Sequence, residues 1–308
     1  MIRKFIVGID LGGTNLKVAL LDCKYRILHK EVLSTKDFSK KDQLISAIIQ
    51  AVRSILRNGG ISDKQLVGLG IGLPGPIDTV AGLVHFFPNI PGWKDVNLRN
   101  TLEKKLKIPV SIDNDANLMC LAEFKKGAAR GAQNAVCLTL GTGVGAGLII
   151  ERKLFRGSSF AAGELGHVPL NEAGPRCNCG GTACLEAYIG NKRVMKKARQ
   201  VFGRNIPLDE LSAMAKKGDK RALGIWNEFS AHLGRALVVV VNLLNPDKIV
   251  IGGGVAAAGR VIFDRVRKVV ATDAMSVQAK RVSILKARLG SDAGMIGAAI
   301  LVNEGNKV

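Results

Sequence analysis

The sequence lacks the long apolar run that a membrane span requires. A spanning helix needs roughly 20 consecutive apolar residues, and the best candidate, ALVVVVNLL at 236–244, is too short and contains Asn242. Near the start, Asp10 interrupts an apolar stretch that is too short for the core of a signal peptide. We therefore expect a cytoplasmic protein with no membrane partner.

Aromatic residues are scarce, at 5% of the 308 residues, and 25 acidic residues face 45 Lys and Arg, which gives a net charge of +20. A strongly basic chain is a candidate for nucleic-acid binding. The basic residues are spread out, however, and no basic run alternates with aromatic side chains. We expect a solvated basic surface and no nucleic-acid partner. The same charge also fits attraction of an anionic substrate.

Two common nucleotide-binding loops are missing as well. No GK[ST] follows a glycine-rich stretch, which excludes a Walker A loop. The glycine turns DLGGTN at 10–15 and LGTGVGAG at 140–147 each lead into a predicted strand. A Rossmann fingerprint requires a helix at that point, so this motif is excluded too.

The sequence does contain an internal repeat. Residues 5–33 and 134–157 both read as strand, glycine turn, strand, polar turn and strand, and an offset of 129 aligns them without gaps. The repeat predicts a duplicated β-meander and an α/β fold of two lobes with a cleft between them. The length agrees with two domains, which we place at 1–116 plus 294–308 and at 117–293.

The paired glycine turns predict phosphate binding. Glycine lets the backbone approach a ligand closely, and successive N–H groups form an anion site. Either turn alone also reads as an ordinary hairpin turn. Asp10 at the mouth of the first turn predicts a Mg²⁺ held through water. A third stretch, IGGGVAAAG at 251–259, follows a strand and precedes a helix, which suits a nucleotide.

Asp113, Asn114 and Asp115 fall where a predicted strand meets a predicted helix. One interpretation is plain capping of the helix, which Asp and Asn favour. The other is a general base, kept ionised by the positive end of the helix dipole and able to accept a hydroxyl proton.

The six cysteines divide into two groups. Cys23, Cys120 and Cys137 stand singly in apolar segments and read as core residues. Cys177, Cys179 and Cys184 lie close together among glycines. In a cytoplasmic chain, such a cluster favours metal ligands over disulfides.

Taken together, the motifs resemble the ROK family of sugar kinases and sugar-responsive repressors. They cover nearly the whole chain in family order, and the pattern is most similar to the bacterial glucokinase branch. The resemblance implies a two-lobed actin/hexokinase-like fold of duplicated ribonuclease H-like domains, and ATP-dependent phosphorylation of a hexose at its 6-hydroxyl. The motifs that carry it are DLGGTN, GLPGPID, PNIPGW, DNDAN, LGTGVGAG, GELGH, CNCGGTACLE and NPDKIVIGGGV.

The resemblance also implies roles for individual residues. Asp115 matches the catalytic base, and further positions match residues that bind the sugar, the phosphates or the adenosine. The sugar-side positions are Asn89, Asn114, Asp115, Glu164, His167 and Glu186; the nucleotide-side positions are Asp10, Gly12, Gly13, Thr14, Thr142, Gly143, Gly253 and Gly254.

A structural zinc site is implied at His167, Cys177, Cys179 and Cys184. A closed tetrahedral site with three sulfurs and one nitrogen suits structural Zn²⁺. Ala183 departs from the family pattern, which commonly has glycine there. Alanine costs little at this position unless the backbone needs a positive φ.

Several alternatives stay open. The substrate is expected to be glucose, with mannose, fructose, allose, N-acetylglucosamine and N-acetylmannosamine as alternatives, and polyphosphate is an alternative to ATP. A non-enzymatic ROK regulator is disfavoured because a strand begins near Phe5 and leaves no room for a helix-turn-helix, and an actin-like filament protein because of the sugar-side motifs. The family resemblance implies a homodimer or homotetramer.

Overall fold

The computed structural model describes residues 4–35, 38, 40–87 and 93–305. The chain divides into two compact units. The first contains the residues up to Ala122, the segment 156–162 and the residues from Ser291 on, whereas the second contains Glu123–Phe155 and Gly163–Gly290. These units differ from the predicted lobes of 1–116 plus 294–308 and 117–293 in helix α3 (Asp115–Lys126), which is divided at Ala122, in the segment 156–162 and in residues 291–293.

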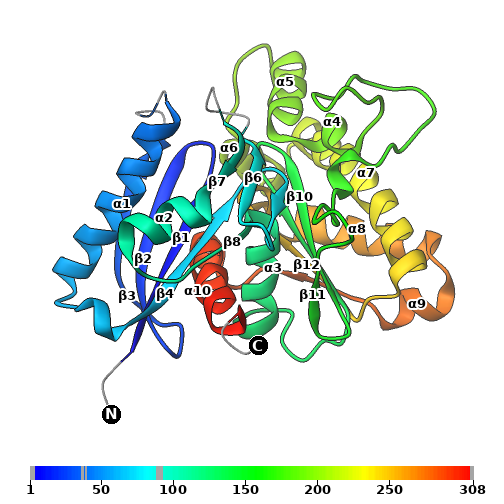
Figure 1. The fold of residues 1–308 in the computed structure, drawn as a ribbon. Coiled ribbons are helices and arrows are strands. Elements are labelled where there is room, and N and C mark those ends of the chain that lie inside the picture. The colour runs from blue at the N-terminus through cyan, green and yellow to red at the C-terminus, as the bar shows by residue number, and fades with distance from the viewer. Residues whose placement is uncertain (1–3, 36–37, 39, 88–92, 306–308) are drawn as a thin grey trace. The chain divides into compact units, whose positions relative to one another are not determined.

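The first unit is built on a five-stranded sheet with the order β3-β2-β1-β4-β8 (Figure 1). The first three strands form an antiparallel meander, and β4 and β8 join it in parallel. The predicted meander is thereby confirmed. The strands are β1 (Phe5–Leu11), β2 (Asn15–Asp22), β3 (Ile27–Ser34), β4 (Leu66–Leu73) and β8 (Val110–Asn114).

Helix α10 (Ala293–Gly305) packs very closely on this sheet because the strands present glycines to it. Gly8 and Gly70 are paired between β1 and β4. A Cβ at Gly8 would lie 2.2 Å from the carbonyl oxygen of Met295, and one at Gly70 would lie 2.0 Å from that of Ala298. Val7 and Ile9, which alternate with Gly8 along β1, instead share a core with α1 (Lys41–Asn58) and α2 (Leu98–Leu106).

A small antiparallel sheet follows β4 in the chain, and the sequence patterns did not reveal it. Its strands are too short to show a clear alternation of apolar and polar residues. They are β5 (Ile77–Asp78), β6 (Leu83–Phe86) and β7 (Lys94–Asn97), in the order β5-β6-β7.

The second unit repeats the topology of the first, with the order β11-β10-β9-β12-β13. The offset of 129 holds for the first two strands and fails at the third, because the β10–β11 turn is shorter. Glu151 and Arg152 both have positive φ, 50° and 66°, which is the two-residue type I′ hairpin turn. The strands are β9 (Ala135–Leu140), β10 (Val144–Ile150), β11 (Lys153–Phe155), β12 (Lys248–Gly252) and β13 (Ser283–Lys286).

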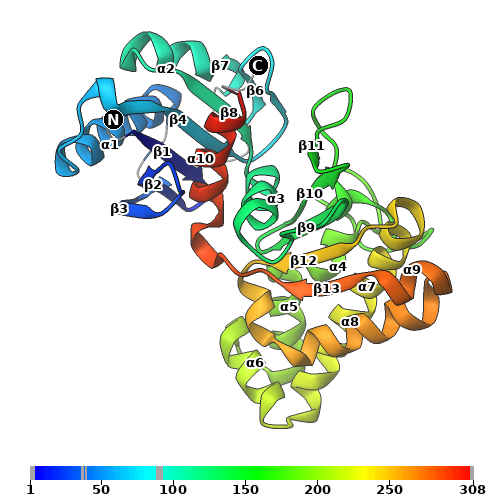
Figure 2. The same ribbon diagram turned by 90° about the horizontal axis from the view of Figure 1, so that it is seen from below.

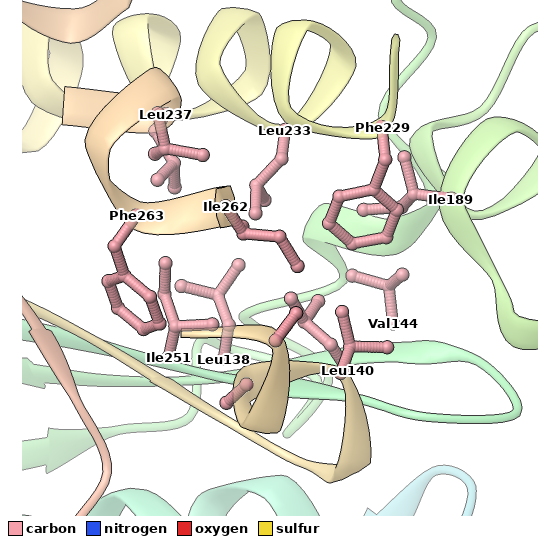
Figure 3. Packing of buried hydrophobic residues seen from close by; sticks show 14 of the residues in the cluster. Leu138, Leu140, Val144, Ile189, Phe229, Leu233, Leu237, Ile251, Ile262 and Phe263 are labelled. Carbon is pink, nitrogen blue, oxygen red and sulfur yellow. The ribbon is translucent and has the colours of Figure 1, made fainter. Parts of the chain in front are cut away.

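Helices α7 (Lys220–Leu244) and α8 (Arg260–Asp273) cover one face of the second sheet (Figure 2). Leu233 and Leu237 of α7 and Ile262 of α8 point at the sheet from above in Figure 3, and they share a buried core with the inward-facing residues of β9 and β12. Among the described residues, no helix is long and apolar enough to span a membrane.

Shorter helices complete the second unit. The stretch 191–218 forms two helices, because Gly203 ends the first with φ 73° and Pro207 precedes the next one. Helix α3 starts in the first unit and ends in the second. The remaining helices are α3 (Asp115–Lys126), α4 (Leu185–Ile189), α5 (Asn191–Phe202), α6 (Leu208–Lys216) and α9 (Ser276–Arg281).

Candidate active site

Four metal-ligating side chains gather in the second unit, between β11 and α4 in the chain. The donor atoms of His167, Cys177, Cys179 and Cys184 all lie within 4.8 Å of one another. The Sγ of Cys177 is 3.7 Å from Nδ1 of His167, and the Sγ atoms of Cys179 and Cys184 are also 3.7 Å apart. The three thiols are free. The structure therefore brings together a compact set of three sulfurs and one nitrogen.

The backbone around the thiols forms a tight knuckle. The N–H of Cys177 donates to the carbonyl oxygen of Gly181 at 2.9 Å, and the N–H of Gly180 donates back to Cys177 at 3.1 Å. Gly180 has φ 92°, a conformation that glycine adopts without strain. A Cβ at Gly181 would lie 3.2 Å from the Sγ of Cys184 and 3.4 Å from that of Cys179. Both glycines are therefore needed to bring the thiols together.

Ala183 adopts a backbone conformation that is unfavourable for alanine. Its φ is 59°, and its side chain is fully buried. The left-handed region costs an L-residue roughly 1–2 kcal/mol. The expectation that alanine costs little here depended on a negative φ, so the departure from the family pattern carries a local strain.

The clustered thiols shift one another's pKa values. The backbone N–H of Gly181, followed by the Cys177 thiol, lowers the pKa of Cys179. Burial, followed by the contacts with Cys179 and Cys177, raises the pKa of Cys184 to about 12. Protein groups alone therefore keep Cys184 protonated at neutral pH, and a bound cation is what would convert it to a thiolate ligand.

The imidazole of His167 has a different neighbour at each nitrogen. Nδ1 faces the thiols, whereas Nε2 lies 3.8 Å from a carboxylate oxygen of Glu164. The side chains of His167 and Glu164 are 36% and 56% exposed, so both are accessible to a ligand. A ring placed in this way can bind a metal through one nitrogen and a hydroxyl through the other.

Glu186, in the first turn of α4, connects this region to the second glycine turn. Its Oε2 accepts the backbone N–H of Val144 at 2.9 Å. A Cβ at Gly143 would lie only 2.4 Å from the same oxygen. Gly143 was predicted as a phosphate-loop residue, and the structure adds that a side chain at this position would displace the Glu186 carboxylate from its present place.

The remaining glycines of the predicted nucleotide site differ in their surroundings. Gly253 is required by the fold, because it has φ 87° and a Cβ would lie 2.0 Å from the carbonyl oxygen of Leu140. Gly141 and Gly254 have nothing within 4 Å of a Cβ, and Thr142 is exposed. As predicted, the stretch 251–259 follows a strand, β12, and precedes a helix, α8, which begins at Arg260; within the stretch, Gly254–Ala258 forms a short 3₁₀ turn.

The first glycine turn joins β1 and β2. The N–H of Gly12 donates to the carbonyl oxygen of Asn15 at 2.9 Å, and Gly13 and Thr14 are exposed. The Asp10 carboxylate accepts a hydrogen bond from Nζ of Lys17 at 3.0 Å. A carboxylate at the mouth of this turn would repel phosphate if no cation were near it. Lys17, its partner across the β1–β2 ladder, supplies a positive charge there.

The acidic residues at the start of α3 have separate environments. Asp113 is 1% exposed, while Asn114 and Asp115 are half-buried. Asn114 Nδ2 donates to the carbonyl oxygen of Gly75 at 3.1 Å, and its Oδ1 accepts the N–H of Ala116 at 2.9 Å. Asn114 therefore acts as a helix cap as well as a candidate ligand residue.

The structure groups the predicted residues by unit. Asp10, the first glycine turn, Asn114 and Asp115 lie in the first unit. The thiol cluster, Glu164, Glu186 and the other glycine turns lie in the second. Asn89 falls outside the described residues. Sequence reasoning missed Lys17, which strand pairing with Asp10 would have indicated, and Arg156, which binds Asp113 from a distant segment and left no local signal.

Two sheets that repeat one topology, with glycine turns at the same place in both meanders, define the class of this protein. It has the actin/hexokinase-like fold of duplicated ribonuclease H-like domains, and solved kinase structures of this class match it along the whole chain. Residues 6–305 match the ROK family, and the chain belongs to that family.

Similar proteins agree with this membership. A glucokinase of Halalkalibacterium halodurans is 34% identical over 99% of this chain and 96% of its own. A ROK hexokinase of Thermus thermophilus superposes with a TM-score of 0.83 at 32% identity, covering 98% of this chain and 99% of that one. A ROK family glucokinase of Streptomyces griseus, solved with glucose and AMPPNP, has a TM-score of 0.83 at 30% identity and covers 98% and 100% of the two chains.

Proposed function

We propose that this protein is an ATP-dependent glucokinase that transfers the γ-phosphate of ATP to the 6-hydroxyl of glucose. The observation that carries the proposal is Asp115, a half-buried carboxylate in the first turn of α3, which the family resemblance implies to be the catalytic base. The full-length similarity to glucokinases supports the choice of glucose and ATP. The cytoplasmic location and the homodimer or homotetramer stay predictions.

Asp115 would accept the hydroxyl proton as the sugar oxygen attacks the phosphate. The positive end of the α3 dipole favours its ionised form. Asn114 beside it offers an amide to a sugar hydroxyl, and Glu164, His167 and Glu186 would bind further hydroxyls. The backbone N–H groups of Gly13, Thr14 and Thr142, which are exposed residues of the two turns, would stabilise the charge of the transferring phosphate.

Mg²⁺ would be held at Asp10. A single carboxylate suits an ion that keeps most of its waters and binds the substrate phosphates, and Lys17 balances the charge of Asp10 in the protein alone. When bound, Mg²⁺ would neutralise charge on the β- and γ-phosphates.

Zn²⁺ would be held by His167, Cys177, Cys179 and Cys184. The donor set fits, because three sulfurs and one nitrogen lie within reach of one ion and the glycines of the knuckle leave room for it. With all four positions filled by protein, the metal would be structural, and would hold the segment that carries Glu164, His167 and Glu186.

Replacement of Asp115 tests the function. Asp115→Asn should bind glucose with nearly unchanged affinity and lose turnover by roughly 10²-fold or more. Asp42→Asn is a matched control, because Asp42 is also a carboxylate in the first turn of a helix, outside the proposed site. An Asp115→Asn variant with near wild-type turnover would show that Asp115 is not the base.

A substrate panel tests the specificity. Glucose, mannose, fructose, allose and the two N-acetylhexosamines would each be offered with ATP or with polyphosphate in a coupled assay. We expect the highest kcat/KM for glucose with ATP. A preference for another hexose would replace glucose as the proposed substrate. If none of the hexoses is phosphorylated, the proposed kinase activity is refuted and a sugar-responsive regulator is favoured.

A further inference from the structure

We propose that Arg156 is a positioning residue for phosphoryl transfer, since it holds the buried Asp113 carboxylate that in turn fixes the backbone at Asn114 and Asp115. The proposal rests on the proposed function, in which Asp115 is the base. Arg156 follows β11 directly in the chain, and it belongs with Asp113 to the first unit.

The two oxygens of Asp113 have different partners. Oδ2 accepts a hydrogen bond from Nε of Arg156 at 2.8 Å, and Nη2 of the same guanidinium forms an ion pair with it at 2.7 Å. Oδ1 accepts the backbone N–H of Asn114 at 2.7 Å and the side-chain amide of Asn117 at 2.9 Å. One oxygen therefore holds the cation, and the other holds the junction between β8 and α3.

Burial makes the arginine necessary to this arrangement. Asp113 is 1% exposed and the Arg156 side chain is 26% exposed, so the carboxylate depends on protein groups for its hydrogen bonds, and Arg156 supplies the positive charge. An unpaired buried carboxylate is costly, and loss of one partner of such a pair is far more harmful than loss of both. Without Arg156, Asp113 would turn toward solvent and release the N–H of Asn114.

Release of that N–H would disturb the proposed base. Asn114 is tied to Gly75 and to Ala116 by its side chain, and Asp115 is the next residue. A general base must lie within hydrogen-bond distance of the proton it takes, so a small shift of the backbone lowers the rate of the chemical step. The effect should appear in kcat more than in glucose affinity.

The loop that carries Arg156 is closed on itself. The N–H of Ala162 donates to the carbonyl oxygen of Arg156 at 3.0 Å. Gly157 and Phe160 have positive φ, 72° and 59°, which turns the chain back within the segment 156–162. The guanidinium therefore extends from a well-defined loop. Its planar group presents two nitrogens to one carboxylate oxygen, which the single ammonium group of lysine cannot do.

Substitution of Arg156 tests the proposal. Arg156→Met should lower kcat by about 30-fold or more while the KM for glucose changes less than about threefold, and Arg156→Lys should restore only part of kcat. The matched control is Arg26→Met, because Arg26 forms a similar pair with Asp22 at 2.7 Å but is 72% exposed. It should leave kcat unchanged.

The double variant Arg156→Met/Asp113→Asn separates positioning from direct catalysis. The asparagine oxygen still accepts the N–H of Asn114 and leaves no unpaired charge, so the double variant should regain about tenfold in kcat over Arg156→Met. If the double variant is as slow as the single one, Arg156 acts on the substrate itself. If Arg156→Met keeps wild-type kcat and loses only thermal stability, its role is structural. Either result overturns the proposal.

Hydrogen exchange supplies a readout that does not need activity. The amides of residues 114–117 should exchange faster in Arg156→Met than in wild type or Arg26→Met, because the acceptor at Asp113 is lost. If exchange is faster in Arg156→Met but the wild-type protein phosphorylates no hexose, the proposed glucokinase activity is refuted, while the effect of Arg156 on the backbone at residues 114–117 stands. Unchanged exchange in an active kinase would refute the positioning alone.

Discussion

The carboxylate of Glu186 accepts a hydrogen bond from the backbone N–H of Val144, with 2.9 Å between Oε2 and the nitrogen. The bond joins the first turn of α4, next to the thiol cluster, to the end of the turn Gly141–Gly143. A hydrogen bond to a charged group contributes about 1.5–3 kcal/mol. Glu186, a predicted sugar-binding residue, thus supports the predicted phosphate loop Gly141–Gly143 within one unit of the protein.

Gly143→Ala should break this connection. The new methyl group would lie 2.4 Å from Oε2 of Glu186, so the carboxylate must move and the N–H of Val144 loses its acceptor. We expect kcat/KM for glucose to fall about tenfold or more, since 1.36 kcal/mol corresponds to a factor of ten, together with a lower Tm. Steady-state kinetics and thermal unfolding measure both effects, and unchanged values would show that Glu186 tolerates the displacement.

Gly141→Ala is the matched variant in the same turn, with a different expectation. Nothing lies within 4 Å of a Cβ at Gly141, so the protein itself accommodates alanine and Tm should stay within about 1 °C of wild type. If the turn holds the ATP phosphates, the added methyl group blocks their approach to the backbone. The KM for ATP should then rise about tenfold, a loss of about 1.4 kcal/mol in binding, with unchanged glucose affinity. An unchanged KM for ATP would place the nucleotide elsewhere.

Cys184→Ser should weaken glucose binding even though Cys184 is not a predicted sugar ligand. The variant removes one of the four proposed zinc donors, so zinc content by mass spectrometry should fall. Glucose affinity by calorimetry should then drop about tenfold, as expected for residues that orient others around a metal.

Cys23→Ser is the control for that experiment, because Cys23 lies outside the cluster and is exposed, so its predicted place in the core was wrong, whereas Cys120 and Cys137 are buried. It should retain both zinc and glucose affinity. Removal of the metal from wild type with a chelator should reproduce the Cys184→Ser result. A zinc-free protein with full glucose affinity would show that the metal and the sugar site are independent.

We expect the folded protein to lose stability in mild acid because of His232 on α7. Burial, and to a lesser degree Arg235, lowers the pKa of His232, although Glu228 opposes the shift. Its ring stacks on Tyr188 of α4 with 4.3 Å between the centroids. Because the folded-state pKa lies below the unfolded value of about 6.5, the unfolded chain takes up the proton first as pH falls. Stability is thus full above about pH 6.5 and declines as pH falls toward the folded-state pKa.

A comparison of Tm at pH 7.5 and 5.5 tests this expectation. His232→Phe keeps an aromatic ring against Tyr188 and removes the titration, so the variant should lose less Tm between the two pH values than wild type. An equal loss in both proteins would assign the acid sensitivity to other groups.

The repeated meander could be predicted because its signals are local. Apolar runs joined by glycine turns mark β1, β2, β9 and β10 directly in the sequence. The third strands did not follow the same offset, because the type I′ turn at Glu151 and Arg152 is shorter than the turn between β2 and β3. Strands as short as β5 carry too few residues for any period to show.

The sequence by itself determined the family, the repeated fold, the spacing of four potential zinc ligands and the position of Asp115. Each depends on residue types at short or fixed spacing. Only the tertiary structure decided which partner each charged group has. Asp113 and Arg156 lie on opposite sides of the second glycine turn in the chain, as 43 residues separate them, and Glu186 is 42 residues from Val144. Such contacts are set by how the strands and helices pack, because burial forces each carboxylate to find a donor wherever the fold places one.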